Sequence, residues 1–369
     1  MRIVHVGYRL PPEPGGLERH IERLAREQLA RGHRVVVAHR RGRAPEGAQT
    51  LTLRRTRRSR LLARRSDVLA FGLECARALR DAGEVDVVHV HGDHRETLAL
   101  GPAARRLGVP LVVTVHGAMT MRHLPIMPFA FRHVDDFIAI GARPAQDLRG
   151  AGVPASRIAT MSSGLDLRHI ARHHGEPVEP GLIVSVGSLE KVKNHAVTIE
   201  AFHALRALHP GARLVIAGEG SERAALQQLA GTGRGVHLAG HLPESEVYAL
   251  VARAQAFVLA SRRLPTIGEG IPTAALEALA LGTPVILSSE TSLEPIVEAG
   301  AYRTFLSGSV PDLVRRLREV LEGDRALPEI IERGLRAAAT LDWSSVAARV
   351  EERYTALLPG GPLLPATAS

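Results

Sequence analysis

The fold of this chain is decided by residues 1–37, whose sequence is MRIVHVGYRLPPEPGGLERHIERLAREQLARGHRVVV. A short apolar run at Ile3–Val6 predicts a buried strand, and the paired glycines at 15–16 follow it. Apolar residues then recur at helical spacing over Leu17–Leu29, and Val35–Val37 predicts the next strand. A strand, a glycine loop, a helix and another strand are the repeating unit of a doubly wound parallel sheet.

The same pattern continues along the chain and starts again near its middle. Most of the later runs are apolar on successive residues, as expected for parallel strands that are covered on both faces. These predicted strands are Val85–Val90, Leu111–Val115, Phe137–Ile140, Ile183–Val186, Leu214–Ala217, Ala256–Leu259 and Val285–Leu287. Residues 175–181 are rich in Gly, Pro and Glu and predict a linker. We therefore expect an α/β protein with two Rossmann-like, doubly wound parallel-sheet domains.

Length and composition fit a two-domain globular protein. The chain has 369 residues, of which 45% are hydrophobic and 23% are charged. No run of about 18 apolar residues lacks a charge, so a membrane-spanning helix is not expected. Residues 1–7 have the pattern of a strand and not of an export signal. Because Cys75 is the single cysteine, no disulfide can form within the chain, and we expect a cytoplasmic protein.

The formal net charge is +9, and arginines cluster in Arg54–Arg65. Such a run could hold anionic lipid headgroups, nucleic acid or a phosphate-bearing acceptor. Nucleic acid is disfavoured, because aromatic residues make up 3% of the chain and none lies within this run to stack on a base. We favour a solvated loop or helix face, with peripheral contact to the inner face of a membrane as the alternative.

The strongest local signal is residues 268–285, GEGIPTAALEALALGTPV, which predict a loop, a helix that ends at Gly282, and a strand. Backbone amides near residues 272–275 should be free at the start of this helix, where the dipole favours an anion such as a diphosphate. Glu269 precedes the helix and Glu277 lies one turn inside it. A carboxylate can accept two hydrogen bonds from vicinal hydroxyls of a sugar or ribose. The residues alone leave open a sugar-phosphate site or a capped surface helix with two incidental glutamates.

The spacing of these two glutamates resembles the E-x7-E signature of the family 4 retaining glycosyltransferases, which have the GT-B fold. Other segments resemble the same family in the same order, and the family usually has Asn at the position of Ser163. These segments are Gly15–His20, Asp86–His91, Thr114–Gly117, Ser163–Asp166, Val186–Asn194, Ile216–Gly220, Leu238–His241 and Trp343–Leu357. The resemblance therefore spans nearly the whole chain.

The resemblance implies a division of labour between two domains that face each other across a cleft. Residues 1–176 would form the acceptor-binding domain, and residues 177–341 would bind the nucleotide sugar. A helix over residues 342–358 would cross back to the first domain. Residues 359–369 begin with Pro and Gly and are expected to form a disordered tail.

The resemblance also implies roles for individual residues of the second domain. Glu277 would bind the ribose hydroxyls of the nucleotide. Glu269 would hold the transferred sugar near its 3-hydroxyl, assisted by the backbone amides of Thr273 and Ala274. Lys193 would neutralise the diphosphate as its charge grows during departure. The expected catalytic residues are His116, Lys193 and Glu269.

The same resemblance implies roles for Gly15, Gly16, His116 and Gly240. Gly15 and Gly16 would let the backbone approach the donor where a side chain would collide. His116 would lie beside the donor sugar and orient it, and Gly240 would border the base.

One position departs from the family pattern. Many members carry arginine where this chain has Ser188, which can donate a hydrogen bond but brings no charge. We therefore expect Lys193 to carry most of the positive charge at the diphosphate, unless Lys191 or Arg262 reaches it.

No metal or other cofactor is expected. Transferases that hold Mg²⁺ or Mn²⁺ through an Asp-x-Asp pair need two carboxylates on one short loop, and the sequence contains no such pair. His89 and His91 share one face of a predicted strand, with Asp93 and His94 beyond, which is a conceivable zinc arrangement. We favour substrate contact, because polar residues at the ends of such strands often serve that purpose.

The expected activity is transfer of a hexose from a nucleotide diphosphate sugar to a hydroxyl of a small-molecule, lipid or cell-envelope acceptor. UDP-linked glucose or N-acetylglucosamine is the first expectation and GDP-mannose the next, with the acceptor bound by loops that include Met119–Phe131. We expect retention through front-face attack, because no carboxylate in the motifs is an evident nucleophile. The alternatives are a sugar-nucleotide epimerase of the same fold and a non-catalytic sugar-nucleotide-binding protein.

Overall fold

The computed structural model describes residues 1–13, 15–117, 119, 123–264 and 268–362. Contacts divide the chain into two compact units, which we call unit 1 (Met1–Gly164 with Trp343–Ser369) and unit 2 (Leu165–Asp342). The segment expected to be a linker, residues 175–181, belongs to unit 2, and its last residues begin a strand. Of the expected tail, residues 363–369 lie outside the described part of the chain.

The described residues of unit 1 form a seven-stranded sheet in the order β3-β2-β1-β4-β5-β6-β7, and neighbouring strands are parallel. Its strands are β1 (Arg2–Gly7), β2 (Arg34–Ala38), β3 (Gln49–Thr50), β4 (Val87–His91), β5 (Leu111–Val115), β6 (Asp136–Ile140) and β7 (Ile158–Met161). The residues of β4, β5 and β6 are buried along their whole length, which is why their sequences are almost continuously apolar.

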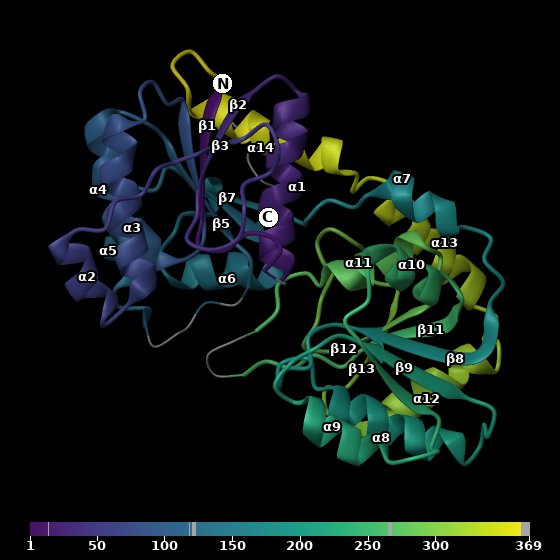
Figure 1. Cartoon of the computed structure of the whole chain (residues 1–369). Coiled ribbons are helices and arrows are strands. Elements are labelled where there is room, and N and C mark those ends of the chain that lie inside the picture. The colour runs from purple at the N-terminus through teal and green to yellow at the C-terminus, as the bar shows by residue number, and fades with distance from the viewer. Residues whose placement is uncertain (14, 118, 120–122, 265–267, 363–369) are drawn as a thin grey trace. The chain divides into compact units, whose positions relative to one another are not determined.

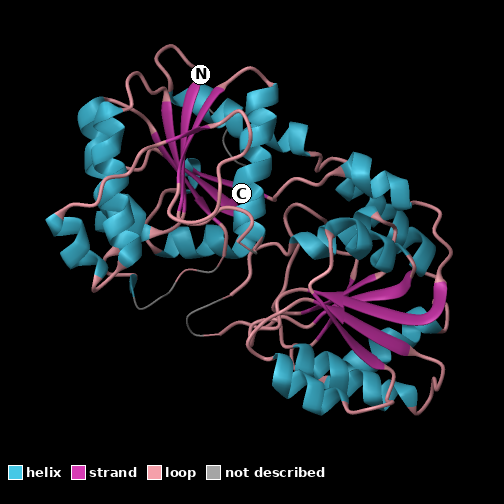
Figure 2. Ribbon diagram, in the orientation of Figure 1, coloured by secondary structure: helices cyan, strands magenta, loops and turns pink. Residues whose placement is uncertain are grey.

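Helices cover both faces of this sheet (Figures 1 and 2). They are α1 (Gly16–Ala30), α2 (Arg57–Ala63), α3 (Asp67–Ala78), η1 (Leu79–Asp81), α4 (His94–Leu107), α5 (Met127–Phe131), α6 (Ala142–Gly150), η3 (Ala155–Arg157) and α14 (Trp343–Leu357). The helices α1 and α14 pack side by side on one face, and α3 and α4 pack together on the other (Figure 1).

The helix α14 is tied to unit 1 by buried contacts. Arg353 forms an ion pair with Asp136 of β6, and both side chains are almost fully buried. Arg31 at the end of α1 donates a hydrogen bond of 2.8 Å to Glu351. The ring of Trp343 packs where a side chain on Gly164 would have to lie, since a Cβ there would come within 2.4 Å of it. The last helix is therefore an integral part of unit 1.

The described residues of unit 2 form a six-stranded parallel sheet in the order β10-β9-β8-β11-β12-β13. Its strands are β8 (Glu179–Val186), β9 (Arg213–Ala217), β10 (Val236–Gly240), β11 (Ala254–Leu259), β12 (Val285–Ser288) and β13 (Arg303–Phe305). Its helices are α7 (Leu167–Ile170), η4 (Ala171–His173), α8 (His195–Arg206), α9 (Arg223–Ala230), α10 (Glu244–Ala252), α11 (Thr273–Ala280), α12 (Val310–Leu321) and α13 (Leu327–Ala338). In Figure 1, α8, α9 and α12 lie on one face of this sheet, and α10, α11 and α13 lie on the other.

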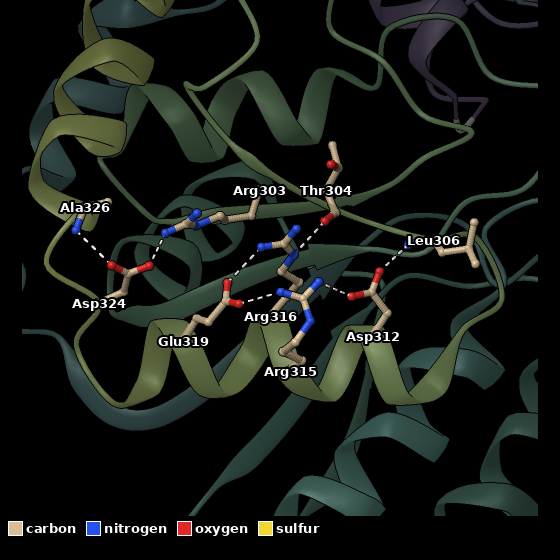
Figure 3. Close-up of polar contacts among 9 residues, drawn as sticks. All are labelled: Arg303, Thr304, Leu306, Asp312, Arg315, Arg316, Glu319, Asp324 and Ala326. Carbon is tan, nitrogen blue, oxygen red and sulfur yellow. Dashed lines mark hydrogen bonds and ion pairs between the residues drawn. The ribbon is translucent and has the colours of Figure 1, made fainter.

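Side chains of α12 bind the backbone around the edge strand β13 (Figure 3). Arg316 donates to the carbonyl of Thr304 at 2.8 Å, and Asp312 accepts from the amide of Leu306 at 2.7 Å. Arg303 of the strand pairs with Asp324 beyond the end of the helix. These contacts hold a strand of three residues that has one strand neighbour in the sheet.

The expected fold class is confirmed, since both units are doubly wound parallel sheets covered by helices. The strands that the sequence did not predict are β3, β7, β10 and β13, and each of them lies at an edge of its sheet. None of the helices in the described ranges is both long and apolar enough to cross a lipid bilayer.

Candidate functional site

Three loops meet at the carboxyl end of the unit 2 sheet, where Ser188 and Gly240 lie. The amide of Gly218, which follows β9, donates to the carbonyl of Gly240 at 2.7 Å. A Cβ on Gly218 would lie 1.9 Å from the carbonyl oxygen of Gly187, and its φ of +150° also favours glycine. This close packing brings the loops after β8, β9 and β10 to one place at the sheet edge, the usual ligand position in an open α/β sheet.

Lys193 and Glu269 form the centre of this region. The ammonium group of Lys193 donates to Oε1 of Glu269, and the side chains are 16% and 14% exposed. The aliphatic stem of Lys193 packs over Gly187, where a Cβ would lie 3.1 Å from Cε. Oε2 of Glu269 is buried and has no hydrogen-bond partner among the described residues. A buried carboxylate oxygen without a donor is costly, so this atom is prepared to accept from a ligand.

The helix α11 begins directly after this carboxylate with unoccupied backbone donors. Pro272 is its N-cap residue, and no side chain caps the helix. Its backbone bonding begins with the amide of Ala275, which donates to the carbonyl of Pro272 at 3.0 Å. The amides of Thr273 and Ala274 precede that bond and have no partner among the residues that the structure describes. The helix start can therefore bind an anion.

Glu277 is buried inside α11 and is held by a tyrosine that the sequence analysis did not find. The hydroxyl of Tyr248 in α10 lies 3.3 Å from Oε1 of Glu277 and 3.0 Å from Oε1 of Glu244. Tyr248 is itself 2% exposed, so its position is fixed by packing. The spacing of Glu244 and Tyr248, four residues apart on one helix, was the only signal in the sequence.

Two further groups surround the loop that carries Lys193. His195 donates from Nε2 to the carbonyl of Ser188 at 3.3 Å, and burial lowers the pKa of His195 to about 4, with the Lys193 charge adding to the effect. Arg262 donates to the carbonyl of Lys191 at 3.2 Å, so this arginine lies against the same loop. Ser188 itself is exposed.

Unit 1 has a pocket of about 650 Å³ at the carboxyl ends of its central strands. The pocket collects histidines, arginines and carboxylates from α1, β4, α4 and the segments that follow β1, β2, β4 and β5. The lining residues include Gly16, Glu18, Arg41, His91, Asp93, Arg95, Glu96 and His116. This mixture of charged and polar groups suits a hydroxylated or charged small molecule.

The expected glycine loop borders this pocket. Gly15 is the N-cap of α1 with a φ of +152°, and a Cβ there would lie 2.0 Å from Oε2 of Glu18. A Cβ on Gly16 would meet no described atom within 4 Å, and Gly16 lines the pocket. Gly15 is therefore required by the fold, whereas Gly16 leaves room beside the pocket.

His116 follows β5 and belongs to a cluster of buried histidines. Its Nε2 lies 3.4 Å from Nδ1 of His91, and burial lowers the pKa of His116 to about 3. The alternative zinc arrangement joined His89 and His91 to Asp93 and His94. The structure places the rings of His89, His5 and His20 beside His91. Asp93 pairs with Arg95 at 2.6 Å and lies 3.6 Å from Nδ1 of His94.

The arginine-rich run, Arg54–Arg65, is a separate stretch of the unit 1 sequence from the histidines just described. Its central part forms α2, which begins with a capping box between Thr56 and Ser59. Leu61 on this helix is 66% exposed. In the expected acceptor loop Met119–Phe131, residues 120–122 lie outside the described part, and Phe129 is 57% exposed.

Two family profiles match consecutive parts of the chain, which together run from residue 14 to residue 336. The profile "Glycosyltransferase Family 4" matches residues 14–169, and the profile "Glycosyl transferases group 1" matches residues 168–336. The chain belongs to glycosyltransferase family 4. The glycosyltransferase thus carries its Lys193–Glu269 pair in the second matched region and His116 in the first.

Relatives and solved structures agree with this assignment. The glycosyltransferase is 29% identical to a protein named glycogen synthase from Mycobacterium tuberculosis, over 98% of this chain and 96% of the relative. It is 27% identical to a GDP-mannose-dependent alpha-(1-6)-phosphatidylinositol dimannoside mannosyltransferase from the same species, over 81% and 82% of the two chains. Anabaena Alr3699/HepE in complex with UDP-glucose superposes with a TM-score of 0.76 at 16% identity, over 96% and 99% of the two chains. The fold is therefore GT-B.

Proposed function

We propose that this glycosyltransferase transfers a hexose from a nucleotide diphosphate sugar to a hydroxyl of a small-molecule or lipid-linked acceptor, with retention and without a metal ion. The observation that carries the proposal is the buried, unpartnered Oε2 of Glu269 beside the ammonium group of Lys193. A carboxylate oxygen that can accept hydrogen bonds from sugar hydroxyls therefore lies beside an ammonium group that can bind phosphate. The hexose would be of the glucose, N-acetylglucosamine or mannose type, and the names of the relatives include a GDP-mannose-dependent enzyme.

The described donors of unit 2 can serve the diphosphate in two ways. Lys193 offers a positive charge, and the amides of Thr273 and Ala274 offer hydrogen bonds at the positive end of the helix dipole. Glu277, positioned by Tyr248, would accept from the ribose hydroxyls. Stabilisation of the growing phosphate charge by such fixed groups contributes roughly several kcal/mol to a transition state.

The ion pair of Glu269 with Lys193 favours front-face attack. Glu269 is paired with Lys193 and its charge is already partly compensated, which makes it a poor nucleophile. In the proposed step the bond between C1 and the phosphate oxygen breaks, and the acceptor oxygen bonds to C1 on the same face. The acceptor proton passes to the departing phosphate oxygen, so no base from the protein is needed and the configuration at C1 is retained.

Unit 1 would supply the acceptor side of the reaction. We assign the acceptor to the pocket lined by His91, Arg95 and His116, with His116 orienting the donor sugar and Gly16 leaving room for it. The domain roles predicted for residues 1–176 and 177–341 are part of this proposal, as is a cytoplasmic location. For Arg54–Arg65 we keep a solvated face as the first reading and peripheral membrane contact as the alternative. No nucleic acid is proposed as a partner.

The test is an NMR assay of the purified protein with a panel of nucleotide hexoses, with and without candidate acceptors, in a buffer that contains EDTA. A transferase releases nucleoside diphosphate and forms a glycoside with the anomeric configuration of the donor. An epimerase converts a donor into another sugar nucleotide when no acceptor is present, and a binding protein leaves every donor intact. Inverted product, or activity that returns only with Mg²⁺, would contradict the proposal.

A further inference from the structure

Five histidines meet inside unit 1, and the proposed function gives a role to two of them, His91 and His116. They are His5, His20, His89, His91 and His116. The ring of His91 is central, with centroids 4.1 Å from His89, 5.2 Å from His5 and 5.6 Å from both His20 and His116. So many imidazoles in one buried cluster offer several nitrogen lone pairs, which are the atoms that bind transition metals.

Hydrogen-bond direction shows where the lone pair of His91 points. Oε1 of Gln28 can only accept, so Nε2 of His5, at 2.6 Å, must carry a hydrogen. A neutral His5 then has its lone pair on Nδ1, and Nε2 of His91 donates to it at 3.0 Å. His91 therefore keeps its own lone pair on Nδ1, which lies 3.4 Å from Nε2 of His116.

His20 adds a third nitrogen from another element. Its Nδ1 lies 2.9 Å from the hydroxyl oxygen of Ser163, and a His20 that donates there keeps its lone pair on Nε2. Its ring stands edge-on to His116 with centroids 4.7 Å apart. One ligating nitrogen from each of His20, His91 and His116 lies within 4.8 Å of the other two.

We propose that His20, His91 and His116 form a binding site for Zn²⁺, with a water molecule from the pocket as the fourth ligand. Tetrahedral nitrogens about 2.05 Å from zinc lie about 3.3–3.4 Å from one another. The separation between His91 and His116 is 3.4 Å, which suits two ligands of one ion and is long for an N–H···N bond. His91 and His116 both line the pocket, which gives an ion a path to the site.

The hydrogen-bond partners of these histidines are arranged as they are around metal ligands in proteins. A histidine that binds a metal usually donates its other ring N–H to a fixed acceptor. Here His91 donates to His5, which is anchored by Gln28, and His20 faces Ser163.

Occupancy of this site would inhibit the transferase. This consequence rests on the proposed function, in which His116 orients the donor sugar. A His116 ring that binds an ion cannot also orient the sugar. The site itself does not depend on the proposed function, since it is defined by binding alone.

The test is titration of Zn²⁺, and of Co²⁺ as a spectroscopic probe, into the chelator-stripped full-length chain. We expect one ion per chain and the intense visible absorption of tetrahedral Co²⁺. His116→Gln should abolish this absorption, and Ser163→Ala should weaken binding about tenfold by releasing His20. His203→Gln, at a histidine that bonds only the carbonyl of Leu229 among the described residues, is the matched control and should bind normally.

Three outcomes would overturn the proposal. They are no stoichiometric binding, a weak octahedral Co²⁺ spectrum, or unchanged binding in His116→Gln. A loss of binding in His169→Gln would instead assign the ion to the Asp166, His169 and Glu244 group of unit 2. Because none of these readouts is enzymatic, a failure of the transferase assay would leave this result intact. Circular dichroism of each variant checks that it is folded.

Discussion

Lys193 donates a hydrogen bond to Glu269 across 76 residues of sequence, and the second oxygen of that carboxylate is buried without a partner. The loop after β8 and the loop before α11 are thereby joined at the carboxyl end of one sheet. A ligand with hydroxyl donors and a phosphate can use both groups at once, without bringing them together first. The pair is thus organised before any ligand arrives.

Replacing Lys193 by Met should lower kcat by roughly 10²- to 10³-fold, because the diphosphate loses the cation that stabilises its departure. The matched control is Lys191→Met, which removes an exposed lysine two residues away and should change kcat little. Steady-state kinetics with the donor identified by NMR measure both. Equal losses in the two variants would mean that general surface charge, and not this ion pair, serves the phosphate.

Replacing Tyr248 by Phe should raise the donor KM while leaving kcat nearly unchanged. The hydroxyl positions Glu277, whose contact with ribose is expected to be the same in the ground state and the transition state. The matched control is Tyr302→Phe, because that hydroxyl accepts only from the amide of Leu293 among the described residues, at 3.4 Å. Both variants should lose about 1 kcal/mol of stability. A KM that rises equally in both would refute the positioning role.

The interior strands could be predicted because both of their faces are covered, which makes their sequences apolar without interruption. Edge strands lack this pattern. Both residues of β3 are exposed, and β13 is three residues long and is held by polar contacts from Arg316 and Asp312. Such strands are defined by tertiary contacts that no local pattern encodes.

The residues of the candidate site also fall into those that the sequence predicts and those that it does not. Lys193 and Glu269 belong to motifs with fixed spacing, so the sequence identifies them, and their direct contact agrees with one shared site. Tyr248 and Gln28 reach their partners only because helices pack onto a sheet, and neither lies in a recognisable motif. The spacing of His89 and His91 predicted a shared face, but the neighbours of that face required the whole topology of unit 1.

Replacing Arg353 by Met should cost about 3–5 kcal/mol of unfolding free energy, because it leaves the buried carboxylate of Asp136 without its partner. The control is Arg336→Met, whose partner Glu332 is 67% exposed, and there the loss should be below about 0.5 kcal/mol. Trp343 is the single tryptophan and lies on the same helix as Arg353, so its fluorescence in urea reports on unit 1. Similar losses in the two variants would contradict a special role for the buried pair.

Acidification should destabilise the protein through the buried histidines. Burial lowers the pKa of His5 to about 4, although its hydrogen bond to Gln28 acts to raise that pKa, and burial lowers the pKa of His116 to about 3. The unfolded chain therefore binds more protons than the folded one between these values and pH 6.5. Stability is therefore lost as pH falls below 6.5, by about 2 kcal/mol for each of these two histidines at pH 5.

Glu96 changes the stability in the opposite direction to these histidines over part of this pH range. Burial raises its pKa from 4.5 to about 8, so the folded state binds the extra proton and stability falls as pH rises between those values. Urea unfolding at pH 7 and pH 5 should therefore show a steeper acid loss in Glu96→Gln than in the wild type. A smaller acid loss in that variant would contradict the buried state of this carboxyl.

Metal-free nucleotide binding is tested most directly by calorimetric titration of UDP, GDP and ADP in EDTA, with wild type and Glu277→Gln. We predict that one of these diphosphates binds the wild type with no divalent ion present. Its binding to Glu277→Gln should be weaker by about tenfold or more, as expected for a lost charge-assisted hydrogen bond. Binding that appears only after Mg²⁺ is added, or equal affinity in the two proteins, would contradict a donor site built from Glu277, Glu269 and Lys193.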